Sequence, residues 1–184
     1  MTIKTASIPI LGLLTVRPMS GYDLKKEIEI SLNFFWSESF GQLYPQLKML
    51  REAGLIALLA PQSDSGREKK TYEITEQGRD VLAKWILQNP VIRPQRDELL
   101  LKMFFATEGD PRAIRNHCVN SRAEAVALLQ RYQAIDAELR DITEHRDKAR
   151  YWRMTLKLGI SQTQNYIRWC DDVVADFDDE GLNT

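Results

Sequence analysis

Apolar residues recur at alternating spacings of four and three through residues 114–142, and this run constrains the fold more than any other feature. Its positions are Ile114, Cys118, Ser121, Ala125, Leu128, Tyr132, Ile135, Leu139 and Ile142. About four heptads without a slip predict one long helix whose apolar seam another helix must cover. Asp110-Pro111 supplies its N-cap and first-turn proline. A second periodic stretch, from about 147 to 177, predicts a last helix of similar length.

The seam has two candidate partners. It can pack against the last helix of the same chain, or against a second copy. A small DNA-binding fold gains affinity by pairing two half-sites, and the seam is longer than one partner helix obviously requires. We therefore favour a homodimer whose interface is formed by Leu128, Tyr132, Ile135, Leu139 and Ile142.

The first third of the chain reads as three short helices. An apolar helix over 8–14 should end before Arg17-Pro18, because proline disfavours helix in the preceding residue. Ser20-Gly-Tyr-Asp23 matches a capping pattern for a second helix. A third helix is predicted over residues 39–53, with Gly54 as its stop.

After Gly54 the pattern changes to two β-prone runs around a polar loop, which predicts a hairpin. Thr75 can cap a fourth helix with Val81, Leu82, Trp85 and Ile86 as its apolar stripe. Three helices, a hairpin and another helix make a winged helix-turn-helix with a two-stranded wing. The proline-containing stretch 88–94 is the best boundary, so we predict a mainly α protein with a winged domain over 1–88 and a helical dimerisation domain over 89–184.

Composition removes several classes of protein. No run of about 18 apolar residues offers a membrane span, and no secretory signal is present, so we expect a cytoplasmic protein without membrane contacts. Two histidines and two cysteines leave few metal ligands, and we expect neither metal nor cofactor. The sequence contains no phosphate-binding glycine loop and no nucleophile motif, so we expect no enzyme activity.

Net charge does not point to nucleic acid, because 25 basic residues stand against 26 acidic ones. Position does: Lys48 lies on the third helix, and Arg67, Lys69 and Lys70 lie at the hairpin tip. In a winged helix these elements meet DNA on one face. The basic residues of the hairpin tip can alternatively be an ordinary solvated loop. The alternative function is a winged helix that binds a protein and has no sequence-specific DNA binding. The ring of Tyr44 can pack, or its hydroxyl can reach a phosphate.

Several segments occur in an order that resembles one family. They are Ile10-Leu-Gly-Leu-Leu14, Met19-Ser-Gly-Tyr-Asp-Leu-Lys25, Phe40-Gly-Gln-Leu-Tyr-Pro-Gln-Leu-Lys48, Gly54-Leu-Ile56, Tyr72-Glu-Ile-Thr75 and Gly78-Arg79. Across residues 8–88 the chain resembles the PadR-like transcriptional regulators. The segment 96–102 and the long helices after it resemble the larger subgroup, which has a helical dimerisation domain.

The resemblance implies a dimeric repressor that binds an inverted repeat in promoter DNA and is released by an effector or a cellular signal. It places Ser20, Gln42, Tyr44 and Lys48 at DNA, with Arg67, Lys69 and Lys70 on the wing. The wing departs from the family's frequent Gly-Arg-Pro-Arg-Lys, because Glu68 stands in Gly66-Arg-Glu-Lys-Lys70. An aromatic small molecule is the effector class we consider. The resemblance to the family does not identify the effector, because family members respond to different molecules.

Overall fold

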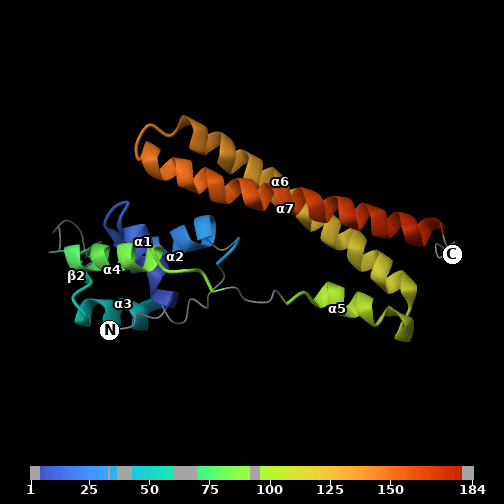
Figure 1. The fold of residues 1–184 in the computed structure, drawn as a ribbon, viewed down its shortest axis with the longest axis horizontal. Coiled ribbons are helices and arrows are strands. Elements are labelled where there is room, and N and C mark those ends of the chain that lie inside the picture. Colours follow the sequence, from blue (N-terminus) through green and yellow to red (C-terminus); the bar gives the residue numbers. More distant parts are fainter. Residues whose placement is uncertain (1–4, 33, 37–42, 60–69, 92–95, 180–184) are drawn as a thin grey trace, which may run out of the picture. The chain divides into compact units, whose positions relative to one another are not determined.

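The structure is a computed structural model that describes residues 5–32, 34–36, 43–59, 70–91 and 96–179. The chain divides into two compact units, residues 1–91 and 92–184. The first combines short helices with a small sheet, and the second is helical (Figure 1). The predicted mainly α fold is confirmed.

The N-terminal unit begins with a 3-10 turn, η1 (Thr5–Ser7), and helix α1 (Ile8–Leu14). Helix α2 (Gly21–Glu27) runs into a π-helical stretch, η2 (Ile28–Leu32). The capping prediction is confirmed, because the Ser20 hydroxyl accepts from the Asp23 N–H at 3.2 Å while the Asp23 carboxylate accepts from the Ser20 N–H at 3.0 Å.

Helix α3 (Leu43–Glu52) buries Leu43, Leu47 and Leu50 in the core of this unit. The predicted start of this helix, residues 39–42, lies outside the described residues. Gly54 follows with φ +71°, the left-handed conformation that glycine adopts without strain. The glycine stop is therefore confirmed.

The predicted hairpin is present, and the sheet has one strand more than the predicted two-stranded wing. Strands β2 (Ile56–Leu58) and β3 (Thr71–Ile74) pair antiparallel, and β1 (Met19–Ser20) pairs with the other edge of β3. Ser20 thus lies opposite Thr71 in the ladder. Two residues are too short a stretch for period-two alternation to be visible, so only the tertiary pairing reveals β1.

Helix α4 (Glu76–Ile86) completes the winged helix-turn-helix, and its predicted cap is confirmed. The Thr75 hydroxyl accepts from the Gly78 N–H at 3.1 Å and donates to the Gly54 carbonyl at 2.8 Å. Only part of the predicted apolar stripe of α4 is buried. Val81 is half-buried, whereas Ile86 is 64% exposed.

The C-terminal unit contains α5 (Glu98–Phe104), a 3-10 turn η4 (Ala106–Glu108), and the long helices α6 (Pro111–Asp141) and α7 (Arg146–Asp179). Asp97 caps α5 and Asp110 caps α6, the latter as predicted. Figure 1 shows α6 and α7 side by side as an antiparallel pair. The buried apolar and small side chains of these two helices are Ile114, Cys118, Ala125, Tyr132, Ala149, Thr163 and Cys170.

Candidate nucleic-acid interface

Helix α3 separates its side chains into a buried face and an exposed one. Opposite the buried leucines, Tyr44 is 65% exposed, and Lys48 and Arg51 are also exposed. We call Tyr44, Lys48 and Arg51 the α3 face. The Lys48 ammonium lies 3.9 Å from the Glu52 carboxylate, but both side chains are largely in solvent. Such a pair contributes little stability, so the ammonium remains available to another anion.

Ser20 occupies a different place from the one expected of a DNA contact. It is only 4% exposed, and its hydroxyl donates to the Asp23 carboxylate at 2.7 Å. A hydroxyl satisfied in this way stabilises the start of α2. Ser20 therefore positions the exposed side chains of α2, among which Tyr22 is 69% exposed.

The wing is described only at its base. Lys70 is exposed and immediately precedes Thr71, whose backbone pairs with Ser20. Gln42, Arg67 and Lys69 lie outside the described residues. The structure thus places two expected contacts, Tyr44 and Lys48, on one exposed helix face.

Sequence reasoning did not single out Gly21 as a site residue. The ring of Tyr44 packs against its backbone, where a Cβ would stand 2.8 Å from the ring Cε1. Gly21 was visible in the Ser20-Gly-Tyr-Asp23 segment, but the residue facing it was not. Only the packing of α2 on α3 identifies its partner.

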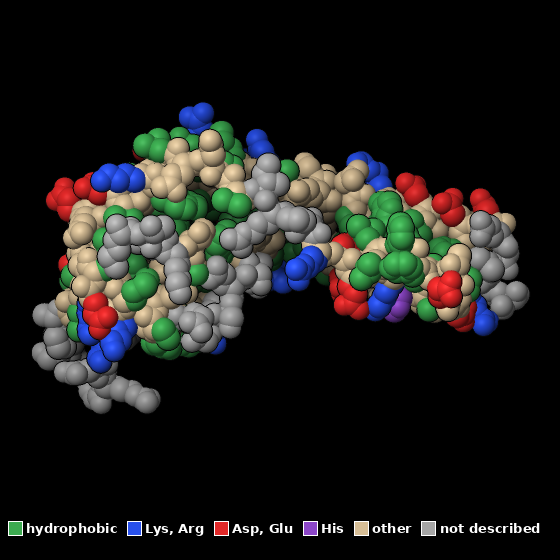
Figure 2. Space-filling view, turned by 60° about the horizontal axis from the view of Figure 1, so that its bottom comes forward, with side chains coloured by type: hydrophobic (Ala, Val, Ile, Leu, Met, Phe, Trp, Pro, Cys, Tyr) green, Lys and Arg blue, Asp and Glu red, His purple; other side chains and the backbone are tan. Residues whose placement is uncertain are grey.

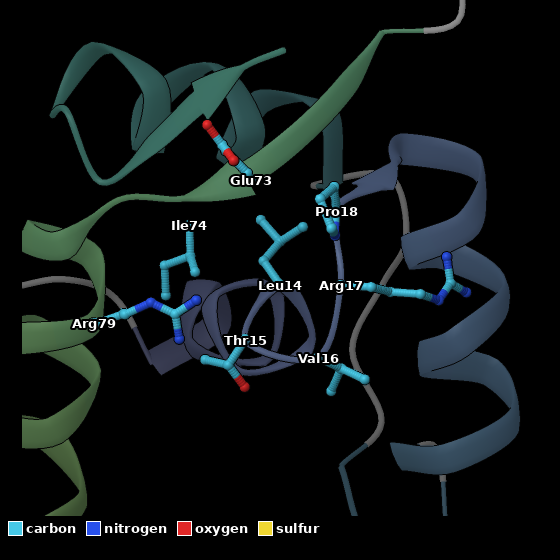
Figure 3. Close-up of a pocket in the computed structure, with 8 residues that line it drawn as sticks. All are labelled: Leu14, Thr15, Val16, Arg17, Pro18, Glu73, Ile74 and Arg79. Carbon is cyan, nitrogen blue, oxygen red and sulfur yellow. The ribbon is translucent and has the colours of Figure 1, made fainter. Parts of the chain in front are cut away.

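A shallow pocket of about 150 Å³ lies where α1 ends beside β3 and α4 (Figure 3). Its lining includes Arg17, Glu73 and Arg79. Arg17 turns to α2 and pairs with Glu27 at 2.9 Å. The volume is below the roughly 300 Å³ at which drug-sized ligand sites begin, so this pocket offers little room for an effector.

The heptad seam faces α7 of the same chain. Tyr132 is 5% exposed and lies against Gly159 of α7, where a Cβ would stand 3.2 Å from the Tyr132 ring. Leu128, Ile135, Leu139 and Ile142 are half-buried on the same seam. The intrachain alternative therefore accounts for Tyr132, which leaves this side chain little surface for a second copy.

Other apolar side chains of the C-terminal unit are exposed, and Figure 2 shows hydrophobic side chains gathered on this unit. They are Leu100, Leu101, Phe104, Phe105, Val119, Tyr151, Trp152, Met154 and Leu158. We call them the outer apolar set. Three of its members lie on α5, among them Phe104, which is 82% exposed and meets the next residue, Phe105, edge to face.

Among the described residues, no helix combines the length and apolarity needed to cross a bilayer. The described part of the chain also contains no group of three metal-ligating side chains. Both long helices instead carry cross-helix ion pairs, such as Arg115 with Asp178 at 2.7 Å.

Two protein-family models match the chain and together span both units. Residues 10–84 match the transcriptional regulator PadR-like family, and residues 95–178 match the virulence activator α C-terminal model. The chain belongs to the PadR-like family of transcriptional regulators. The resemblance inferred from the helix, turn and hairpin segments is thereby confirmed.

Individual relatives of this PadR-like chain match it along nearly its full length. The negative transcriptional regulator PadR of Bacillus subtilis is 27% identical over 182 residues, covering 96% of this chain and 99% of the relative. Its crystal structure with operator DNA has a TM-score of 0.80 at 26% identity, covering 94% and 98%. Its structure with p-coumaric acid has a TM-score of 0.74, covering 95% and 99%. The Vibrio cholerae virulence activator AphA has a TM-score of 0.71 at 27% identity, covering 96% and 99%.

Proposed function

We propose that this PadR-like regulator is a homodimeric repressor that binds an inverted repeat in promoter DNA. The α3 face carries the proposal: Tyr44 and Lys48 project from a helix anchored by Leu43, Leu47 and Leu50. A relative with the same fold has been solved on operator DNA. In winged helices the third helix enters the major groove and the wing reaches the backbone.

The proposed contacts divide by chemistry. Lys48 and Lys70 would neutralise phosphates, and Arg67 and Lys69 would do the same from the wing. Gln42, which precedes α3 in the sequence, is the proposed reader of base edges. Ser20 would act indirectly, by fixing the start of α2.

A dimer follows from the proposed inverted repeat, because two-fold DNA sites mirror two-fold proteins. The α5 end of the outer apolar set, formed by Leu100, Leu101, Phe104 and Phe105, is the surface that we propose for this contact. It contains Leu101 and Phe104, which an isolated chain would leave in water. The half-buried seam residues Leu128, Ile135, Leu139 and Ile142 would contribute only their outer edges. Such a regulator acts beside the chromosome, in the cytoplasm.

Repression and release rest on the Bacillus subtilis relative, which is named a negative regulator and was solved with p-coumaric acid. We propose an aromatic acid as effector class. The exposed Tyr151 and Trp152 with the neighbouring Arg150 offer rings and a positive charge for such a ligand.

The test begins with selection of duplexes from a randomised DNA pool by the purified chain. We expect an inverted repeat bound by two chains, with affinity that falls steeply as salt rises. Adding p-coumaric acid should release the duplex and raise the melting temperature of the free protein. Failure to enrich any duplex would contradict DNA binding. Enrichment without release by aromatic acids would contradict only the effector.

A further inference from the structure

The ring of Tyr44 rests on the backbone of Gly21, so helix α3 touches helix α2 where a side chain is missing. A Cβ at Gly21 would stand 2.8 Å from Cε1 and 3.3 Å from Cζ of Tyr44. It would also stand 3.4 Å from Cδ1 of Leu47, which is ordinary contact. Tyr44 is therefore the residue whose ring must shift when a larger side chain stands at this position.

This contact fixes an exposed side chain against rigid backbone. Tyr44 keeps 65% of its surface exposed, whereas Gly21 is buried. Gly21 starts α2, and the reciprocal Ser20–Asp23 hydrogen bonds hold that start in place. Ser20 is also paired with Thr71, beside Lys70 at the base of the wing. The position of the Tyr44 ring is thus tied, through Gly21 and Ser20, to the strand that forms the base of the wing.

We propose that Gly21 is a positioning residue for DNA binding, acting through Tyr44. The missing side chain lets the aromatic ring lie on α2, which sets the point at which the Tyr44 hydroxyl meets a phosphate of the duplex. Tyrosine hydroxyls are common phosphate donors, and such contacts fix the register of a protein on DNA. This inference rests on the proposed DNA-binding function.

A purely structural role for Gly21 predicts a different result. Overpacking would then lower stability, while the folded fraction of Gly21→Ala would bind DNA as tightly as wild type. A positioning role instead makes the binding effect of Gly21→Ala depend on the presence of the Tyr44 ring. A double-mutant cycle separates the two roles, because it isolates the coupling between the two positions.

The experiment measures binding of wild type, Gly21→Ala, Tyr44→Ala and the double variant to the duplex that wild type selects from a randomised pool. Circular dichroism establishes that each protein is folded at the assay temperature. Gly12→Ala is the matched control, because a Cβ at Gly12 has no heavy atom within 4 Å.

We expect Gly21→Ala to weaken binding at least about tenfold, equivalent to about 1.4 kcal/mol. Tyr44→Ala should weaken it similarly, the double variant should bind no worse than Tyr44→Ala, and Gly12→Ala should bind as wild type. Wild-type affinity in Gly21→Ala, or additive losses in the double variant, would overturn the positioning role. If Gly21→Ala does not fold, a folded double variant with the affinity of Tyr44→Ala supports it, and an unfolded double variant overturns it. Absence of any selected duplex would instead remove the proposed function itself.

Discussion

Asp136 of α6 accepts a hydrogen bond from Arg153 of α7 at 3.0 Å, which ties the two long helices together. Arg140, one turn further along α6, donates to the same carboxylate through Nε at 2.9 Å. Asp136 is only 9% exposed. The hydrogen bonds from Arg153 and then Arg140 hold the pKa of this carboxyl below its ordinary value.

Asp136→Asn should lower the free energy of unfolding by about 1 to 2 kcal/mol at neutral pH, because Arg140 is exposed and water screens part of the interaction. A lowered carboxyl pKa stabilises the fold above the ordinary pKa of aspartate. That stability is lost as pH falls through the lowered pKa. Chemical denaturation from pH 7 to pH 2 should therefore show a flatter acid decline in the variant.

The control for Asp136→Asn is Glu138→Gln, which alters an exposed carboxylate on the same helix. It should leave both the stability and the acid decline as in wild type. Equal acid profiles for wild type and Asp136→Asn would show that this carboxylate does not link α6 to α7 energetically.

Phe104→Glu should weaken the proposed dimer at least about tenfold, because it places a charge within an apolar contact. Phe104 is 82% exposed, so the fold itself should tolerate the change. Sedimentation velocity across a concentration series measures the shift toward monomer. Thr107→Glu adds the same charge at an exposed polar site nearby and should remain dimeric. A Phe104→Glu protein that sediments as wild type would exclude α5 from the interface.

Tyr132→Ala should act on stability rather than on assembly. The buried ring packs on Gly159, and large-to-small changes of aromatic core residues cost about 3 to 5 kcal/mol. Thermal unfolding followed by circular dichroism should show that the variant loses its helix signal at a lower temperature than wild type. A stable monomer would instead indicate that Tyr132 belongs to the interface between copies.

Lys48→Ala should weaken binding to the selected duplex and flatten its salt dependence. Each phosphate contact adds about 0.9 to the logarithmic slope, so a dimer that loses two lysines should lose about two units. Titrations at several salt concentrations give this slope. Lys157→Ala removes the same charge from an exposed position on α7 and should leave the slope unchanged. A steep, unaltered slope in Lys48→Ala would remove Lys48 from the proposed contacts.

Cys118 and Cys170 should resist thiol reagents in the native protein. Both are fully buried between α6 and α7, and burial raises the pKa of each thiol. A raised pKa leaves less of the reactive thiolate. With an aromatic disulfide reagent we expect two thiols to react in denaturant and essentially none within minutes in buffer. Rapid labelling of native protein would show that the helix pair opens readily.

Gly78→Ala should lower the stability of the N-terminal unit by about 1 to 3 kcal/mol, the usual cost of overpacking. A Cβ at Gly78 would stand 2.1 Å from the Leu55 carbonyl oxygen and 2.8 Å from Cγ1 of Ile74. Urea unfolding measures the change. Gly12→Ala should raise stability slightly, because alanine favours helix and the site is open. Equal stability for the two variants would contradict the close approach at Gly78.

The sequence predicted the elements that depend on neighbouring residues. Helix caps form between residues within one turn, so residue type and spacing suffice to predict them. The examples are Ser20 with Asp23, Thr75 with Gly78, and Asp110 with Pro111. Gly54 is similar, because its positive φ is a local requirement. The family and the winged fold followed from the order of these local signals.

The sequence left open the contacts that join distant residues. The pairing of Ser20 with Thr71 joins two strands that are separated in the sequence by α2, α3 and β2. The packing of Tyr44 on Gly21 likewise needs two helices in place. Neither has a spacing that periodicity can detect. Gly21 therefore remained unassigned, and Ser20 was expected at DNA although its hydroxyl is enclosed.

For the apolar seam of α6, the sequence determined that a cover is needed, and only the tertiary structure shows which helix lies against it. The alternating spacings determined that one face of this helix must be covered, because an apolar stripe in water costs free energy. They did not determine whether the cover comes from the same chain or another, since a heptad pattern is the same for both. In the structure α7 of the same chain covers Tyr132 of this seam, because a helix linked by a short turn is present at high effective concentration.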